Sequence, residues 1–171
     1  MKLKTRELAI FALLGAIMYV SKVLMEWIPN VHLLGALTMA YTLVYRRKAL
    51  YPIYVYVFLN GALGGFNAWW IPYLYIWTVL WVVTMLLPKQ MPRRVSSIIY
   101  MVVCALHGFT FGILYAPAQA IMFGLSFEAT IAWIISGFPF DIIHGIGNFF
   151  CGMLILPIAT LLKYLERTSG S

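Results

Sequence analysis

The chain has 171 residues, of which 63% are apolar, 16% aromatic and only 10% charged, and its mean hydropathy is +0.90. A soluble domain is about 45–50% apolar and about 25% charged, and a chain this small cannot bury such an apolar excess in its own core. The composition therefore excludes a soluble enzyme, a nucleic-acid-binding domain and a disordered chain. It predicts an all-α polytopic membrane protein.

Apolar runs separated by Lys, Arg, Pro, Gly and Asn predict a six-transmembrane-helix bundle in a single domain, since one span needs about 20 apolar residues. In chain order, the predicted spans cover residues 7–27, 32–45, 49–63, 71–87, 95–123 and 138–164. The second and third spans are short, so we expect neighbouring helices to shelter them. Residues 126–136 are predicted to form a separate short helix, with Ser126 as its N-cap and Glu128 in its first turn.

The net charge of +7 is explained by the residues that flank the spans. Eleven of the twelve Lys and Arg residues precede span 1, follow span 6, or lie between spans 2 and 3 or spans 4 and 5. With six spans these four segments share one side of the membrane, which the positive-inside rule assigns to the cytoplasm. Both termini are therefore predicted to be cytoplasmic, and no nucleic-acid partner is expected.

Polar side chains inside the spans concentrate toward the opposite, external side. They are Lys22, Glu26, His32, Asn60, Asn67, Gln119, Asp141, His144 and Asn148. His107 is nearer the middle of the membrane and is interpreted as a structural histidine. A polar group in the bilayer is costly and usually faces the protein interior or a water-filled cavity. This distribution predicts a binding pocket that opens to the exterior.

Two of these groups have a simpler interpretation. Lys22 and Glu26 are four residues apart on one helix and can neutralise each other. Asp141, His144 and Asn148 share one helix face, which either contacts a ligand or forms an interhelical hydrogen-bond cluster. An Asp and a His on one helix turn also occur in acid–base catalysis. No nucleophile accompanies them in this sequence, so no catalytic residue is predicted.

The segment from Asn67 to Trp77 is the most aromatic part of the chain. Within nine residues it contains Trp69, Trp70, Tyr73, Tyr75 and Trp77. These rings are interpreted as an interfacial aromatic belt, as the wall of a pocket for a bulky organic ligand, or as both. The glycines that precede them, Gly61, Gly64 and Gly65, permit a mobile loop.

Small residues in the first span, Ala12, Gly15 and Ala16, allow another helix to approach closely. The approaching helix belongs either to a docking partner or to this bundle. The sequence has no phosphate-binding G-x-x-x-x-G-K-[ST] loop, so we do not expect this chain to bind ATP in that way. It also has no spacing of Cys or His that predicts a metal site, and no cofactor is expected.

Three features together define a pattern over nearly the whole chain. They are the six spans, the motif Ala12-x-x-x-Ala16 and the stretch Pro139-Phe-Asp-Ile-Ile-His-Gly-Ile-Gly-Asn148. This pattern resembles the substrate-binding S components of energy-coupling factor (ECF) transporters, which import vitamins into prokaryotic cells. The resemblance implies a multi-pass protein of the plasma membrane that captures a vitamin or a related micronutrient near the external surface.

The resemblance also implies partners and site residues. Ala12, Gly15 and Ala16 would face the transmembrane coupling protein, and two cytoplasmic ATPases would use the ATP. The ligand would contact the first and second outer loops and the last span, through His32, Asn60, Asn67, Trp69, Trp70, Tyr73, Asp141, His144 and Asn148. The aromatic, weakly charged outer end favours cobalamin, with a queuosine precursor, pantothenate, folate or a pyrimidine as alternatives.

Two other functions remain open from the residues alone. A stand-alone membrane carrier would need polar residues through the full thickness of the bilayer, and the inner halves of the spans have almost none. A small intramembrane enzyme would need a reactive set of groups, of which only Asp141 and His144 are present.

Overall fold

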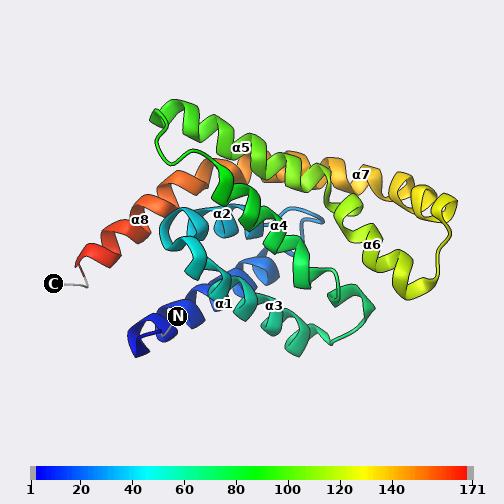
Figure 1. Ribbon diagram of the computed structural model, residues 1–171, viewed down its shortest axis with the longest axis horizontal. Helices are drawn as coiled ribbons and strands as arrows, with labels where there is room; N and C mark the ends of the chain where they lie inside the picture. Colours follow the sequence, from blue (N-terminus) through cyan, green and yellow to red (C-terminus); the bar gives the residue numbers. More distant parts are fainter. Residues whose placement is uncertain (1–2, 169–171) are drawn as a thin grey trace.

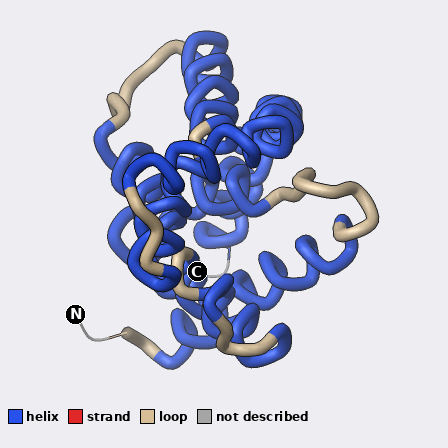
Figure 2. Tube along the Cα trace, turned by 90° about the vertical axis from the view of Figure 1, so that its right-hand side faces the viewer, coloured by secondary structure: helices blue, strands red, loops and turns tan. Residues whose placement is uncertain are grey.

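The computed structural model describes residues 3–168, and every regular element in this part of the chain is a helix (Figure 1, Figure 2). The prediction of an all-α protein is confirmed. The α-helices are α1 (Thr5–Met25), α2 (Leu34–Tyr45), α3 (Leu50–Gly64), α4 (Tyr73–Leu86), α5 (Arg93–Phe109), α6 (Phe111–Phe123), α7 (Phe127–Cys151) and α8 (Ile155–Thr168). Three short 3-10 helices join them, η1 (Arg46–Ala49), η2 (Ala68–Trp70) and η3 (Gly152–Leu154).

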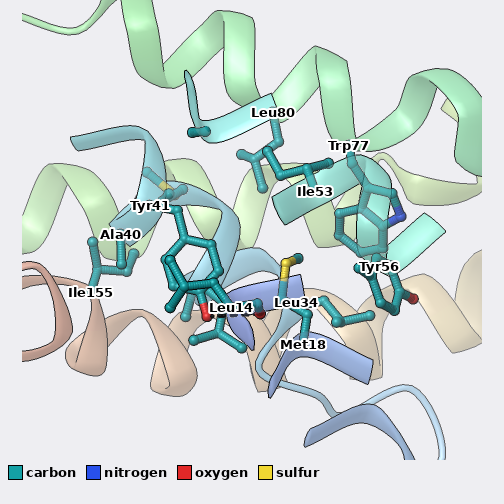
Figure 3. Close-up of a cluster of buried hydrophobic side chains, with 14 of the residues drawn as sticks. Leu14, Met18, Leu34, Ala40, Tyr41, Ile53, Tyr56, Trp77, Leu80 and Ile155 are labelled. Atoms are coloured by element: carbon teal, nitrogen blue, oxygen red, sulfur yellow. Dashed lines mark hydrogen bonds between the residues drawn. The ribbon is translucent and has the colours of Figure 1, made fainter. Parts of the chain in front are cut away.

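The helix α2 lies at the centre of the molecule. Its first nine residues, 34–42, are all buried, and it contacts α1, α4, α5, α7 and α8. Side chains of α1, α3, α4 and η3–α8 close around it; the core labelled in Figure 3 consists of Leu14, Met18, Leu34, Ala40, Tyr41, Ile53, Tyr56, Trp77, Leu80 and Ile155. The expectation that neighbouring helices shelter the short second span is therefore confirmed.

The most extensively packed pair of helices is α5 and α7, which run side by side in Figure 1. Two glycines permit this close approach. A Cβ atom added to Gly108 would lie 2.8 Å from backbone atoms of both Gly145 and His144. Because these are backbone atoms, no side-chain rotation can make room, and the two helix axes would have to separate.

Four stretches of the described chain are long and apolar enough to cross a membrane, Thr5–Met25, Ala68–Leu86, Arg93–Phe123 and Phe127–Thr168. Large apolar side chains such as Leu24, Leu86 and Ile121 are exposed on the outside of the helices. Such a surface suits lipid better than water, so the fold is compatible with a multi-pass membrane protein. With 12 and 15 residues, α2 and α3 are shorter than the roughly 20 residues of a typical span. The count of six spans therefore stays a prediction.

One predicted helix was wrong. Residues 126–136 do not form a separate helix, because α7 continues from Phe127 to Cys151 through Gly137 and Pro139. A proline removes only one backbone donor, and transmembrane helices tolerate this loss. The predicted fifth span, 95–123, lies within the candidate membrane-crossing stretch Arg93–Phe123, which consists of two helices that meet at Thr110. The N-cap at Ser126 is confirmed, since its side chain accepts a hydrogen bond from the Ala129 backbone N–H at 3.2 Å.

The last predicted span, 138–164, begins inside α7 and continues into α8. The helix changes at η3, where Gly152 lies against α5. An added Cβ at Gly152 would lie 2.8 Å from the Cα of Met101. This tight contact lies where the α-helical geometry of α7 changes to the 3-10 geometry of η3, before α8 begins.

Both ends of the described chain lie on the same side of the molecule. The start of α1 and the end of α8 are at the left of Figure 1, as are η1 and the connection from α4 to α5. These segments carry the basic residues that we assigned to one side of the membrane, apart from Lys2, which lies outside the described residues. The predicted topology also groups these segments on one side, and their assignment to the cytoplasm stays a prediction.

The contribution of the contact between α5 and α7 to stability can be tested at two glycines that both lie inside helices. We expect Gly108→Ala to lower the free energy of unfolding by about 1–3 kcal/mol, because it overpacks a backbone contact. Gly137→Ala should be neutral or stabilising, since a Cβ there meets nothing within 4 Å and alanine favours helix over glycine. Thermal unfolding of both variants in detergent would check this, and equal unfolding temperatures would contradict it.

Candidate functional site

Five side chains from five different segments form a compact group, which we call the histidine cluster. Its members are His32 from the α1–α2 connection, Trp77 from α4, His107 from α5, Phe111 from α6 and His144 from α7. The ring centroids are 4.7 Å apart for His32 and His144, and 4.8 Å apart for Phe111 and His144. Trp77 lies 5.6 Å from His107 and 6.1 Å from His32. All three histidines of the chain are therefore gathered around two aromatic rings.

The surrounding helices hold the cluster in place. The Nε2 atom of His107 is 3.2 Å from the carbonyl oxygen of Ile76, which ties α5 to α4. Tyr56 on α3 lies edge-on to Trp77, with centroids 6.0 Å apart. Both Tyr56 and Trp77 are buried, and packing therefore fixes the position of the indole.

Polar atoms without partners are concentrated in and beside this cluster. Nine buried side-chain N and O atoms among the described residues lack a hydrogen-bond partner. Seven of them belong to His32 (Nδ1), Tyr56 (Oη), Asn60 (Oδ1 and Nδ2), Trp77 (Nε1), His107 (Nδ1) and His144 (Nε2). An unsatisfied buried polar group costs about 1–3 kcal/mol, and native proteins contain few of them. This part of the molecule therefore has unused capacity to bind a hydrogen-bonding molecule.

A cavity of about 280 Å³ adjoins the cluster, and we call it the outer cavity. His32, Tyr73, Phe111 and His144 line it on the inside; Lys22, Met25, Glu26 and residues 28–31 complete its wall. The Nζ atom of Lys22 is 2.8 Å from Oε1 of Glu26, so the two charges neutralise each other as the simpler interpretation predicted. The cavity thus presents neutral polar and aromatic groups, with a balanced ion pair at its edge.

Three of the predicted ligand-binding residues, His32, Tyr73 and His144, line this cavity. Asn60 does not line the cavity; it is 1% exposed and lies on α3 one helical turn from Tyr56, whose ring packs on Trp77. The structure therefore brings three of the predicted residues to one cavity, although they come from three segments of the chain.

The predicted aromatic wall is only partly at the cavity. The Trp70 Nε1–H donates to the Val57 carbonyl at 2.8 Å, which binds the α3–α4 connection to α3. The Trp69 carbonyl accepts a hydrogen bond from the Tyr115 hydroxyl at 2.8 Å, which binds the same connection to α6. Asn67 is exposed at the start of η2. These three residues hold or border the segment that follows α3 and do not line the outer cavity.

Asp141, His144 and Asn148 share one buried face of α7, as predicted, but they point to different partners. The Gly112 backbone N–H donates to both carboxylate oxygens of Asp141, at 3.0 and 3.2 Å. The Asn148 Nδ2 donates to the Cys104 carbonyl at 3.2 Å. For Asp141 and Asn148 the interhelical alternative therefore describes the structure, and only His144 faces the cavity.

Several residues of this region were missed or interpreted differently from the sequence. Trp77 belonged to the aromatic run, and His107 was interpreted as structural, but neither was placed in the site. Phe111 and Tyr56 carried no signal, because apolar and aromatic residues occur throughout every span. Among the described residues, no group of three or more His, Cys, Asp or Glu side chains has the geometry to hold a metal ion.

The predicted docking residues of α1 divide between two faces. Ala12 is exposed and Ala16 is half-buried, whereas Gly15 is buried against α3. A Cβ added to Gly15 would lie 2.6 Å from Cβ of Val55 and 2.9 Å from the Pro52 carbonyl oxygen. Gly15 therefore serves packing within the bundle, and the face that a partner could reach retains Ala12 and Ala16.

Comparison of the chain with known protein families, characterised proteins and solved structures gives no match.

The contact at Asp141 predicts a structural effect. Asp141→Ala leaves the N-terminal turn of α6 without its acceptor, so the free energy of unfolding should fall by about 1–2 kcal/mol. Asp141→Asn keeps one acceptor oxygen and should lose less. Thermal unfolding in detergent measures both, and an unchanged unfolding temperature for Asp141→Ala would show that the carboxylate does not stabilise α6.

Proposed function

We propose that this protein is the S component of an ECF-type importer and binds a vitamin-like molecule at the outer cavity. The observation that supports this most directly is that His32 and His144, which line that cavity, have buried ring nitrogens without partners, as do Trp77 and His107 of the adjoining histidine cluster. A ligand that accepts and donates hydrogen bonds would satisfy these atoms on entry. Binding would thereby remove the free-energy cost of leaving these buried polar groups without hydrogen-bond partners.

The chemistry of the site favours a neutral, partly aromatic ligand. Imidazole, amide and phenol groups of the cavity wall supply hydrogen bonds, while the rings of Tyr73 and Phe111 supply flat apolar contact. The only charges at the wall, Lys22 and Glu26, already pair with each other. A strongly charged ligand would find no unpaired counter-charge among the lining residues.

The size of the cavity bears on which vitamin binds. Pockets for drug-sized ligands span about 300–1,000 Å³, and the outer cavity has about 280 Å³. Cobalamin, the first ligand to test, would require the α1–α2 connection, which forms much of the cavity wall, to move outward. A queuosine precursor, pantothenate, folate or a pyrimidine requires less movement, in keeping with their smaller sizes.

Energy coupling would come from other chains. In this proposal Ala12 and Ala16 form the face of α1 that a transmembrane coupling protein contacts, and two cytoplasmic ATPases hydrolyse the ATP. Small residues let two helices approach closely in lipid, and both alanines are accessible at the surface of α1. The chain would span the prokaryotic plasma membrane six times, with its termini in the cytoplasm.

A substitution at Asn60 can distinguish a role in ligand binding from a role in stability. We expect Asn60→Leu to raise the unfolding temperature of the ligand-free protein, because leucine removes a buried amide without partners. The same change should weaken cobalamin binding about tenfold, since at least one hydrogen bond is lost. Quenching of tryptophan fluorescence measures the affinity, with the four smaller candidate ligands tested in parallel.

Thr38→Val is the matched control for this experiment. The Thr38 hydroxyl is also buried and unpartnered, but Thr38 lies in α2, which contributes no side chain to the histidine cluster, whereas Asn60 lies one helical turn from Tyr56, whose ring packs on Trp77. Its replacement should raise stability and leave the affinity unchanged. Unchanged affinity of Asn60→Leu for every ligand that binds the wild type would contradict the proposed site.

The docking face has its own test. Ala12→Leu and Ala16→Leu should abolish cellular uptake of labelled cobalamin while leaving its affinity for the purified protein unchanged, because larger side chains block close helix approach. Ala132→Leu, at an exposed alanine of α7, is the control. Purification in mild detergent should also recover a membrane scaffold and two ATPases. Uptake by the purified chain alone in vesicles would instead identify a stand-alone carrier.

A further inference from the structure

An apolar groove lies between α1 and α8. The start of α1 and the end of α8 lie on the same side of the molecule (Figure 1). It has a volume of about 520 Å³. Its walls are Ile10, Leu13, Leu14 and Ile17 from α1 and Ile158, Leu161, Leu162 and Leu165 from α8, and its floor includes Leu37 and Tyr41 from α2. The groove exists because α1 packs mainly on α3, whereas α8 packs mainly on α2.

This groove is open to the surroundings of the protein. Leu13, Ile17, Leu161 and Leu165 are exposed, while Leu14 and Leu162 beneath them are buried. In a membrane protein, a surface groove of this composition at bilayer depth is filled by hydrocarbon. The groove therefore has the chemistry of an acyl-chain site.

The groove ends in a basic pocket. Two smaller hollows adjoin the groove. Lys4, Arg6 and Lys48 line one of them, and Lys163 and Arg167 line the other. Both hollows share Ile10 and Glu166 with the groove. The three spaces thus adjoin one another around the same two residues. Apolar walls give way to cationic walls within the first turns of α1 and the last turns of α8.

Only part of this positive charge is balanced. Arg6 pairs with Glu166 at 3.8 Å, and Lys48 pairs with Glu7. The Tyr45 hydroxyl donates to Glu166 at 3.1 Å and helps to hold that carboxylate. Among residues 3–168, Lys4, Lys163 and Arg167 form no salt bridge with a carboxylate. Five cations against two carboxylates leave three positive charges next to the end of an apolar groove.

We infer that the groove between α1 and α8 binds an anionic phospholipid, with an acyl chain along the groove and the phosphate at the basic pocket. Basic pockets between transmembrane helices at the cytoplasmic side suit anionic headgroups, because each Lys or Arg adds electrostatic attraction there. A zwitterionic lipid would fill the groove equally well but would leave the excess positive charge uncompensated. The inference does not depend on the proposed transport function.

The charge component is tested with the purified full-length protein in detergent. Native mass spectrometry would compare retention of phosphatidylglycerol and of phosphatidylcholine with identical acyl chains. We expect the wild type to prefer phosphatidylglycerol at least tenfold. The triple variant Lys4→Gln, Lys163→Gln, Arg167→Gln should lose this preference, because each removed cation contributes about fivefold. Replacing these three residues breaks no salt bridge of the described chain.

Two controls separate this site from general effects. The variant Lys89→Gln, Arg93→Gln, Arg94→Gln removes the same charge from exposed residues of the α4–α5 region and should keep the preference. Leu161→Trp should fill the groove and reduce retention of both lipids, whereas Leu106→Trp, at an exposed leucine of α5, should not. Unfolding temperatures would confirm that all variants fold.

Three results would overturn the inference. The first is equal retention of the two lipids by the wild type, or equal loss of preference in both triple variants. The second is full displacement of phosphatidylglycerol by millimolar inorganic phosphate, which would indicate a phosphate site without a contribution from the groove. The third is a protein dimer that Leu161→Trp abolishes, which would show that a second copy of the chain covers this face.

Discussion

The architecture depends on the burial of α2, a 12-residue helix that other helices cover on nearly every side. Its small residues make this possible. A Cβ added to Gly35 would lie 2.9 Å from the sulfur of Cys104 and 3.3 Å from Nδ2 of Asn148, so α5 and α7 can approach α2 only at a glycine. Because α2 fixes α1, α4, α5 and α7 around one axis, it also determines which of their side chains meet.

The same constraint creates a division between the two ends of the molecule. At one end, side chains from the α1–α2 connection and from α4, α5, α6 and α7 converge in the neutral histidine cluster, where polar atoms lack partners. At the other end, α1 and α8 diverge over α2 and leave an apolar groove with a basic rim. One end is thus suited to a small molecule that forms hydrogen bonds, and the other to the lipid that surrounds the protein.

The neighbours of each polar residue explain which part of the site could be predicted. The helical spacing of Asp141, His144 and Asn148 correctly placed them on one buried face. Spacing along one helix carries no information about what lies opposite each residue. In the structure Gly112 lies opposite Asp141 and Cys104 opposite Asn148, so two of the three side chains bind backbone groups of adjacent helices. His144 remains at the cavity because an aromatic ring and another imidazole are its neighbours.

By itself, the sequence determined the all-α class, the approximate positions of most helices, the sheltered state of α2 and the capped start of α7. These features follow from local composition and periodicity, because an apolar chain must satisfy its backbone within helices. Only the tertiary structure decided that α7 continues through Pro139, that Gly15 faces α3, and that three distant histidines gather around Trp77 and Phe111. Such features depend on contacts between residues far apart in the chain, where the available space and the neighbouring backbone, rather than the residue type, decide the outcome.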